Sequence, residues 1–242
     1  MADKITFTLD GKSVEAVPGE TIWQVAERLG IEIPHLCYAP EPGYRPDGNC
    51  RACMVEIEGE RVLAASCIRE PGEGMVVTTA SERSKAARKT VFELLLADQP
   101  ARATAHDPDA KLWRWADKVG IADSRYASRT APAADPSHLA MAVNLDACIH
   151  CNLCVRACRE VQVNDVIGMA YRGHGAKIVF DQDDPMGDST CVACGECVQA
   201  CPTGALMEAN LLDAAGTLAK TPDSQVHSVC PYCGVGCQIT YN

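Results

Sequence analysis

Fifteen cysteines dominate the chemistry that this 242-residue sequence can support. They form four groups, at positions 37, 50, 53 and 67, at 148, 151, 154 and 158, at 191, 194, 197 and 201, and at 230, 233 and 237. The N-terminal sequence MADKITFTLDGK has neither an apolar signal core nor a twin arginine, so we expect a cytoplasmic protein. Disulfides are rare in that compartment, and an odd number of cysteines favours metal ligands over a disulfide framework.

The second and third groups repeat one pattern of four cysteines. Both follow C-x2-C-x2-C-x3-C, and the second copy begins 43 residues after the first. Bacterial ferredoxins with two [4Fe–4S] clusters have this spacing, and the fourth cysteine of each run ligates the other cluster. We predict that this cysteine starts a helix leading to that cluster. The predicted ligand sets are Cys148, Cys151, Cys154 and Cys201 for one cluster, and Cys191, Cys194, Cys197 and Cys158 for the other.

Zinc and structural thiols are the alternatives for these two runs. Zinc sites favour isolated C-x2-C pairs, so two complete runs of four cysteines favour iron–sulfur clusters. One position departs from the bacterial pattern, because Arg159 follows Cys158 where Pro202 follows Cys201. That departure is minor.

The first group is Cys37-x12-Cys50-x2-Cys53-x13-Cys67. It differs from the plant-type C-x4-C-x2-C spacing but shares a loop after a helix, a C-x2-C core and a distant fourth ligand. The loop is rich in Pro and Gly, which lets the backbone bend and its N–H groups donate to cluster sulfurs. This pattern predicts a [2Fe–2S] cluster, with a four-cysteine zinc site as the alternative on spacing alone.

The last group holds three cysteines, Cys230, Cys233 and Cys237, and no fourth precedes Asn242. They form an incomplete ligand set for a [4Fe–4S] cluster. An unoccupied tail is the alternative.

Other chemically useful patterns are scarce, and no catalytic residue is predicted. The sequence has no Ser–His–acid set, no P-loop and no G-x-G-x-x-G motif, so neither NAD nor a flavin has an evident pocket. His35, His150 and His174 lie near cysteines but are expected to be packing or loop residues. The Arg/Lys stretch 83–89 alternates with Ala and Ser, which predicts a solvated helix face, with docking of an acidic partner as the alternative.

Composition narrows the classes of partner. The chain has 22 Lys+Arg against 32 Asp+Glu, a formal net charge of −10, which disfavours nucleic acid. No apolar run approaches the roughly 20 residues that a membrane helix needs. We therefore expect neither nucleic-acid binding nor a membrane span.

Strands dominate the first 80 residues. Apolar residues alternate over 5–9, Asp10-Gly11 is a hairpin signal, and 13–17 supplies a second strand. Thr21 is expected to cap a helix that runs through Leu29. Later strands are predicted at 54–57, 62–65 and 76–77, the last of which closes the sheet. Two strands, a helix and more strands are typical of a small β-grasp module.

Helices are predicted after residue 80. Ser81 can cap a helix over 81–99, and another is predicted around 112–119. The long stretch without cysteine between Cys67 and Cys148 marks a domain boundary. We predict an α+β protein with a β-grasp [2Fe–2S] domain at 1–80, a helical connector at 81–140, a bacterial-type two-[4Fe–4S] ferredoxin domain at 141–212, a linker at 213–225 and the start of a further domain at 226–242.

Residues 1–212 resemble the N-terminal iron–sulfur region of the large subunit of complex I. They are also similar to the matching regions of NAD-reducing hydrogenases and NAD-dependent formate dehydrogenases. The segments that carry this likeness are PHLCYAPEPGYRPDGNCRACMVEIEG, CIHCNLCVRACREV and CVACGECVQACPTGAL. The resemblance implies a [2Fe–2S] cluster on Cys37, Cys50, Cys53 and Cys67, and two [4Fe–4S] clusters on the later sets.

One feature of the complex I relatives is missing. They carry a His-x3-Cys-x2-Cys-x5-Cys site between the two ferredoxin-like parts. Here His106 lies at about the right place, but Ala110 stands where the first cysteine should be. We expect that extra cluster to be absent and do not assign His106 as a ligand.

The tail VCPYCGVGCQI is similar to the opening of a molybdenum or tungsten bis-pterin oxidoreductase domain. In that family three such cysteines, with one further on, hold a [4Fe–4S] cluster beside the metal. Together the two likenesses imply the α subunit of a cytosolic NAD-dependent formate dehydrogenase whose catalytic domain is absent from this chain. The chain is then a truncated, fragmentary or naturally short form.

The resemblance implies a role in electron transfer. Electrons would pass from a Mo/W bis-pterin site in a longer parent chain, through a partial third [4Fe–4S] cluster in the tail, the [4Fe–4S] pair and the [2Fe–2S] cluster. They would leave to a flavin/NAD-binding diaphorase subunit. The alternatives are a stand-alone diaphorase subunit or complex I-type iron–sulfur subunit, and a structural zinc protein.

Overall fold

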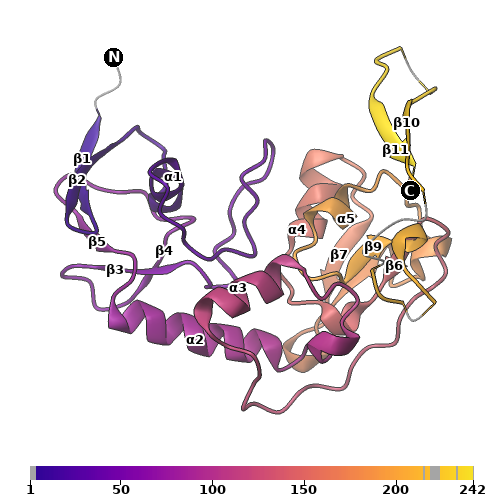
Figure 1. The fold of residues 1–242 in the computed structure, drawn as a ribbon, viewed down its shortest axis with the longest axis horizontal. Helices are drawn as coiled ribbons and strands as arrows, with labels where there is room; N and C mark the ends of the chain where they lie inside the picture. The colour runs from indigo at the N-terminus through magenta and orange to yellow at the C-terminus, as the bar shows by residue number, and fades with distance from the viewer. Residues whose placement is uncertain (1–3, 215, 219–223, 233, 242) are drawn as a thin grey trace.

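The computed structural model describes residues 4–214, 216–218, 224–232 and 234–241. An N-terminal domain with a five-stranded sheet and a C-terminal domain with short helices and strand pairs lie side by side, and a long helix, α2, runs along one edge toward the C-terminal domain (Figure 1). Within the described residues no helix is long and apolar enough to cross a membrane.

The N-terminal sheet has the order β2-β1-β5-β3-β4. Its strands are β1 (Ile5–Leu9), β2 (Lys12–Ala16), β3 (Met54–Ile57), β4 (Ala64–Ala65) and β5 (Val76–Thr78). The sequence led us to expect that β5 closes the sheet, but it does not. It lies inside it, parallel to β1 and antiparallel to β3, because Val77 pairs with both Leu9 and Ile57 and is completely buried.

Helix α1 (Ile22–Arg28) packs on this sheet and completes its core. Thr21 caps it as predicted, and the side chain of Gln24 accepts from the Thr21 backbone N–H in return. Such caps contribute about 1 kcal/mol each. The apolar face of the helix, with Ile22 and Val25, packs among the strand residues of the core. The cap and the buried face together fix where the cysteine loop begins.

The connector contains α2 (Glu82–Leu96), the short η1 (Arg102–Thr104) and α3 (Lys111–Val119). Ser81 caps α2 as predicted, although the helix ends at Leu96 rather than 99. Phe92 of α2 and Leu112 of α3 are fully buried together with Leu36 and Ala52, which flank the first cysteines. The connector therefore packs against the cysteine loop.

The C-terminal domain is built from short elements. They are β6 (Met141–Val143), η2 (Leu145–Ala147), α4 (Leu153–Arg156), the π-helical η3 (Ala157–Val161), β7 (Ile167–Ala170), η4 (Gly173–Gly175), β8 (Lys177–Phe180), η5 (Met186–Asp188), α5 (Glu196–Ala200), β9 (Leu206–Glu208) and η6 (Ala209–Leu211). Strand β6 pairs with β9, and β7 pairs with β8, both antiparallel. One buried core joins the two strand pairs to α4 and α5.

The fourth cysteine of each run does not start a helix, contrary to our prediction. Helix α4 begins at Leu153, just before the third cysteine, and Cys158 lies in the π-helical turn that ends it. Helix α5 begins at Glu196, and Cys201 is the residue that ends it. A single short helix thus carries the third cysteine at one end and the fourth at the other.

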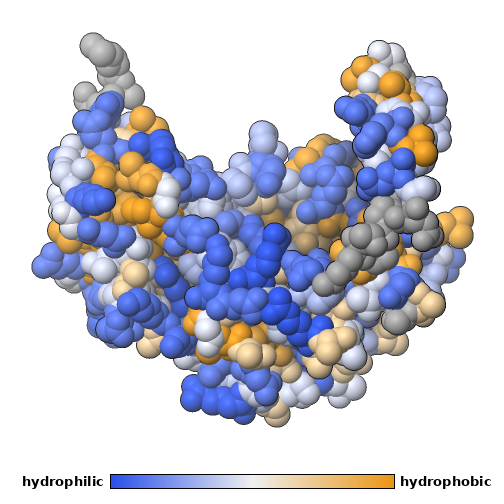
Figure 2. Space-filling view, in the orientation of Figure 1, coloured by the Kyte–Doolittle hydropathy of each residue, from blue (hydrophilic) through white to orange (hydrophobic). Residues whose placement is uncertain are grey.

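The tail forms a hairpin of β10 (Val226–Val229) and β11 (Gln238–Tyr241), which projects from the C-terminal domain (Figure 1). Its strands are mostly exposed, including Val226, Val229 and Tyr241. The surface is hollowed between this hairpin and the N-terminal domain (Figure 2).

Candidate iron–sulfur centres

The N-terminal site consists of Cys37, Cys50, Cys53 and Cys67. Three of these cysteines are 1% exposed, and Cys50 is partly exposed. The Cys50 N–H lies 3.5 Å from Cys37 Sγ as a donor, and the thiols of Cys50 and Cys67 lower the pKa of Cys37 by hydrogen bonding to it. The structure therefore brings the four predicted cysteines together between α1 and the connector.

The site nearer to the N-terminal site is called the proximal site, and the run from Cys148 to Cys158 the proximal run. This site consists of Cys148, Cys151, Cys154 and Cys201, which line one cavity of the C-terminal domain. Apolar side chains complete its wall, including Leu145, Ile178 and Leu206. Burial raises the pKa of Cys148 to about 11 and also raises the pKa of Cys151 and Cys154. Thiolates at such a place need a compensating cation, and metal binding supplies one.

The distal site consists of Cys158, Cys191, Cys194 and Cys197, which line a second cavity with Met141, Val166 and Ile167. Burial raises the pKa of Cys197 to about 12 and raises that of Cys191. Cys194 is exposed, so this site reaches the surface. Each of the two cavities thus holds three cysteines of one run and the fourth cysteine of the other.

The backbone has the same unusual shape in both runs. The residues two and four positions after the first cysteine have positive φ: His150 (54°), Asn152 (62°), Ala193 (55°) and Gly195 (79°). Left-handed backbone costs roughly 1–2 kcal/mol for a residue with a Cβ, so it persists only where the fold requires it. These turns wrap the chain around each cavity, and the internal repeat is therefore a repeat of backbone geometry as well as of cysteines.

Backbone donors at these sites fit bound iron–sulfur clusters. The N–H groups of His150, Ala193 and Val166 point at the sulfurs of Cys148, Cys191 and Cys158, at 3.5, 3.4 and 3.3 Å. Ligand sulfurs of clusters accept such hydrogen bonds. The donor set and the two cavities therefore suit a cluster of several iron atoms.

The histidines have other partners. His35 packs edge-on against Trp23, and its burial lowers its pKa to about 4. His106 lies 3.1 Å from Asp146 through Nε2 and 3.1 Å from the carbonyl of Gly216 through Nδ1. Hydrogen bonding to Asp146 raises the pKa of His106, so that both ring nitrogens can donate. His106 thus ties the connector to the start of the proximal run.

The tail cysteines lie apart from these cavities. The Cys230 N–H donates to the Cys237 carbonyl at 2.8 Å, which closes the hairpin between β10 and β11. Cys237 is exposed, and Cys233 lies outside the described residues.

Two segments match known cluster-binding domains. Residues 2–82 match the 2Fe-2S iron-sulfur cluster binding domain, and residues 147–205 match the 4Fe-4S dicluster domain. A chain from the crystal structure of an NAD+-reducing [NiFe]-hydrogenase in the H2-reduced state is similar over 90% of this chain and 90% of its own length, with a TM-score of 0.76 and 30% identity. This chain belongs to the family of iron–sulfur proteins that includes this hydrogenase chain.

Curated relatives of this iron–sulfur protein are longer. NADP-reducing hydrogenase subunit HndD of Solidesulfovibrio fructosivorans is 35% identical over 92% of this chain and 39% of the relative. A component of an NADH-quinone oxidoreductase of Rhizobium meliloti (strain 1021) is 33% identical over 98% and 27%. A candidate formate dehydrogenase of Staphylococcus haemolyticus (strain JCSC1435) is 27% identical over 99% and 28%. The chain thus spans less than half the length of these relatives.

The iron–sulfur protein is an electron-transfer module with a 2Fe-2S domain and a 4Fe-4S dicluster domain. Three arginines with little-exposed side chains lie at its sites and were not predicted from the sequence. Arg88, within the predicted solvated face, is only 7% exposed and donates twice to the Met54 carbonyl beside Cys53. Arg129 donates to the Cys148 carbonyl of the proximal run, and Arg156, within that run, donates to the Cys37 carbonyl. Of the three, only Arg156 could have been singled out from the sequence, because it stands between the third and fourth cysteines of its run.

Proposed function

We propose that this chain is the iron–sulfur relay of an NAD-dependent formate dehydrogenase. It would hold a [2Fe–2S] cluster at the N-terminal site and one [4Fe–4S] cluster at each of the proximal and distal sites. When bound, such clusters accept and return electrons. The chain would connect a Mo/W bis-pterin site elsewhere in its parent enzyme with a flavin/NAD-binding diaphorase subunit.

The observation that carries this proposal is the continuity of the three sites. Cys37 of the N-terminal site and Cys151 of the proximal site share one small buried cluster with Leu153. Cys154 of the proximal site and Cys197 of the distal site share the core of the C-terminal domain. The sites thus form a row in which neighbours are joined by buried apolar side chains, as an electron relay requires.

The protein's own side chains would position and insulate the clusters. Leu36, Ala52 and Phe92 are fully buried beside the N-terminal site and keep water away from it. Exposure differs along the row, from the enclosed N-terminal site to Cys194 at the surface. Solvent exposure and hydrogen bonds to sulfur are among the means by which a protein sets reduction potentials.

Metal content tests the cluster assignment. Anaerobically purified chain should contain about 10 iron atoms, with matching acid-labile sulfide, for one [2Fe–2S] and two [4Fe–4S] clusters. EPR of the reduced protein should show three signals. About 14 iron atoms would add a cluster at the tail cysteines. Zinc in place of iron, with no EPR signal, would overturn the relay.

A second candidate is a separate iron–sulfur subunit of an NAD-linked hydrogenase. The 90% coverage of both chains in the hydrogenase comparison supports it, whereas the tail segment VCPYCGVGCQI supports the formate enzyme. A tag on the native protein would recover the intact complex from its source. Formate-dependent NAD reduction with bound Mo or W supports the first candidate, and hydrogen-dependent reduction with bound nickel supports the second.

A further inference from the structure

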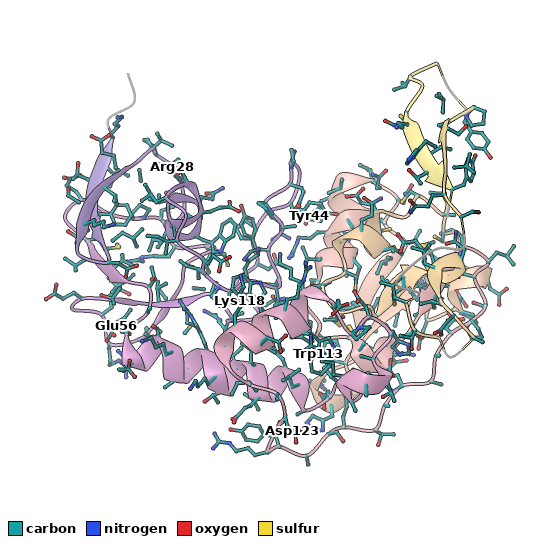
Figure 3. All side chains as sticks on the ribbon, in the orientation of Figure 1. Arg28, Tyr44, Glu56, Trp113, Lys118 and Asp123 are labelled. Carbon is teal, nitrogen blue, oxygen red and sulfur yellow. The ribbon has the colours of Figure 1, made fainter. Side chains whose placement is uncertain are left out.

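The loop between Cys37 and Cys50 extends from the N-terminal domain onto the C-terminal domain. It rises beside α4 in the middle of Figure 1, and Figure 3 shows Tyr44 at this junction. The Tyr44 hydroxyl donates to Glu196 at 2.8 Å, and Arg45 donates to Glu160 at 2.9 Å. The long x12 spacing of the first cysteine group therefore provides a bridge between the domains that carry the N-terminal and proximal sites.

Arg156 of α4 lies at the centre of this bridge. Its side chain is only 2% exposed, its Nη2 donates to the Cys37 carbonyl at 2.6 Å, and it forms an ion pair with Asp47. Arg156 also follows Cys154 of the proximal site by two residues. A buried cation is thus held between ligand residues of two neighbouring sites.

The distal site has no such cation at the equivalent place. The 43-residue offset of the repeat puts the neutral Gln199 where the proximal run has Arg156. A second arginine, Arg129, whose side chain is 5% exposed and pairs with Asp98, donates to the carbonyls of Leu145 and Cys148 at the proximal site. The proximal run therefore has buried guanidinium groups in and beside it, each paired with a carboxylate, and the distal run has a neutral side chain at the place of Arg156.

We propose that Arg156 is a positioning residue that couples the N-terminal and proximal sites and raises the reduction potentials of the clusters there relative to the distal cluster. Reduction adds a negative charge to a cluster, and a fixed cation in a low-dielectric surrounding stabilises that charge. The Cys37 carbonyl and Asp47 hold the guanidinium in place, so its field acts on both sites at once. This inference rests on the proposed function, because it requires clusters at these sites.

Two opposed substitutions test the proposal on the full chain with its clusters in place. Arg156→Gln, the residue of the distal run, removes the buried cation and leaves Asp47 with the exposed Arg45 as its ion-pair partner. Asp47→Asn removes the carboxylate and leaves Arg156 unbalanced. Both break the same ion pair, so a purely structural role would shift potentials in the same direction. An electrostatic role lowers two of the three midpoint potentials in Arg156→Gln and raises the same two in Asp47→Asn.

EPR-monitored redox titration measures these shifts, and the distal cluster serves as the internal reference. The double variant should return close to the wild-type potentials. Arg45→Gln is the matched control, because Arg45 contacts the same Asp47 and bridges the same domains but is exposed, where water and salt screen its charge. Arg156→Lys should restore most of the potential while weakening the magnetic interaction between the N-terminal and proximal clusters, since lysine cannot keep both contacts.

Shifts of the same sign in Arg156→Gln and Asp47→Asn, or no shift in either, would overturn the proposal. If Arg156→Gln loses iron, the Asp47→Asn and Arg156→Lys titrations decide the matter. Absence of clusters from the wild-type chain would instead contradict the proposed function. The two failures are therefore distinguishable by iron content before any potential is measured.

Discussion

The proximal site is enclosed by the connector, the Cys37–Cys50 loop and two buried arginines, whereas the distal site reaches the surface at Cys194. Both sites have the same cysteine spacing and the same pair of left-handed turns. The difference therefore lies in what surrounds the repeat. Burial disfavours added negative charge, and a nearby cation favours it. A duplicated ligand run can thus provide two centres with different properties.

The positions of the proximal and distal sites in the molecule explain why one is enclosed and the other reaches the surface. The centre of the face in Figure 2, where α3 and the Cys37–Cys50 loop meet, is hydrophilic. A cavity there is lined by Glu41, Lys111 and Arg114 together with Cys201 and Pro202 of the proximal region. Burial lowers the pKa of Lys111 at this place. The proximal site therefore lies where two domains and the connector join, while the distal site lies at one end.

The strongest test of the comparison removes the fourth cysteine of each run in turn. Cys201 is the last cysteine of the run that begins at Cys191 but lines the proximal cavity. Cys158 is the last cysteine of the run that begins at Cys148 but lines the distal cavity. Cys201→Ser should lose about four iron atoms from the proximal site, and Cys158→Ser about four from the distal site. Iron analysis and EPR measure both losses, and each variant is the control for the other.

The two variants should differ in one signal. Only Cys201→Ser should remove the magnetic interaction between the N-terminal cluster and its neighbour. Loss of the same EPR signal in both variants would mean that the runs do not exchange ligands.

Much of the local structure follows from the sequence because it depends on neighbouring residues. Thr21 and Ser81 cap their helices as predicted, since a cap needs only the next three residues. The paired runs also place their cysteines around common cavities, because four ligands of one cluster restrict the spacing of the chain. Which cluster each cavity holds stays a prediction.

Long-range features could not be predicted in the same way. The central position of β5 depends on its parallel pairing with β1, nearly 70 residues away, and strand order leaves no mark in an alternating pattern. Arg156 and Asp47 are 109 residues apart and look like ordinary surface charges in the sequence. Only the fold shows that this arginine is buried.

The left-handed turns allow a test of intermediate size. Gly195 in the distal run has φ +79° with open space around its missing Cβ, and Asn152 holds the equivalent place in the proximal run. Gly195→Ala should lower the free energy of unfolding by about 1 kcal/mol through backbone strain alone. Asn152→Gly should change it by only a few tenths of a kcal/mol.

Guanidinium denaturation of the cluster-loaded chain, followed by cluster absorbance and tryptophan fluorescence, measures both effects. An unchanged midpoint in Gly195→Ala would show that the distal turn relaxes where the proximal turn is held. That result would sharpen the contrast between an enclosed site and an exposed one.

The smallest expected effect concerns pH and the contact between His106 and Asp146. This contact raises the pKa of His106 above its ordinary 6.5 and lowers that of Asp146. The stabilisation is therefore fully present below about pH 6.5 and is lost as the pH rises through the raised pKa of His106; at the acid end it is lost as Asp146 becomes protonated. His106→Gln should cost about 1 kcal/mol near pH 6 and less at pH 8.5.

The repeat supplies the control for this last test, because Ser189 stands in the distal run where Asp146 stands in the proximal run. Ser189 donates to the Met186 carbonyl and has no titrating partner in that contact. Ser189→Ala should therefore change the free energy of unfolding by the same amount at both pH values. A pH-independent effect of His106→Gln would mean that the histidine acts as a neutral packing group. In that case the connector would be joined to the proximal site by shape rather than by charge.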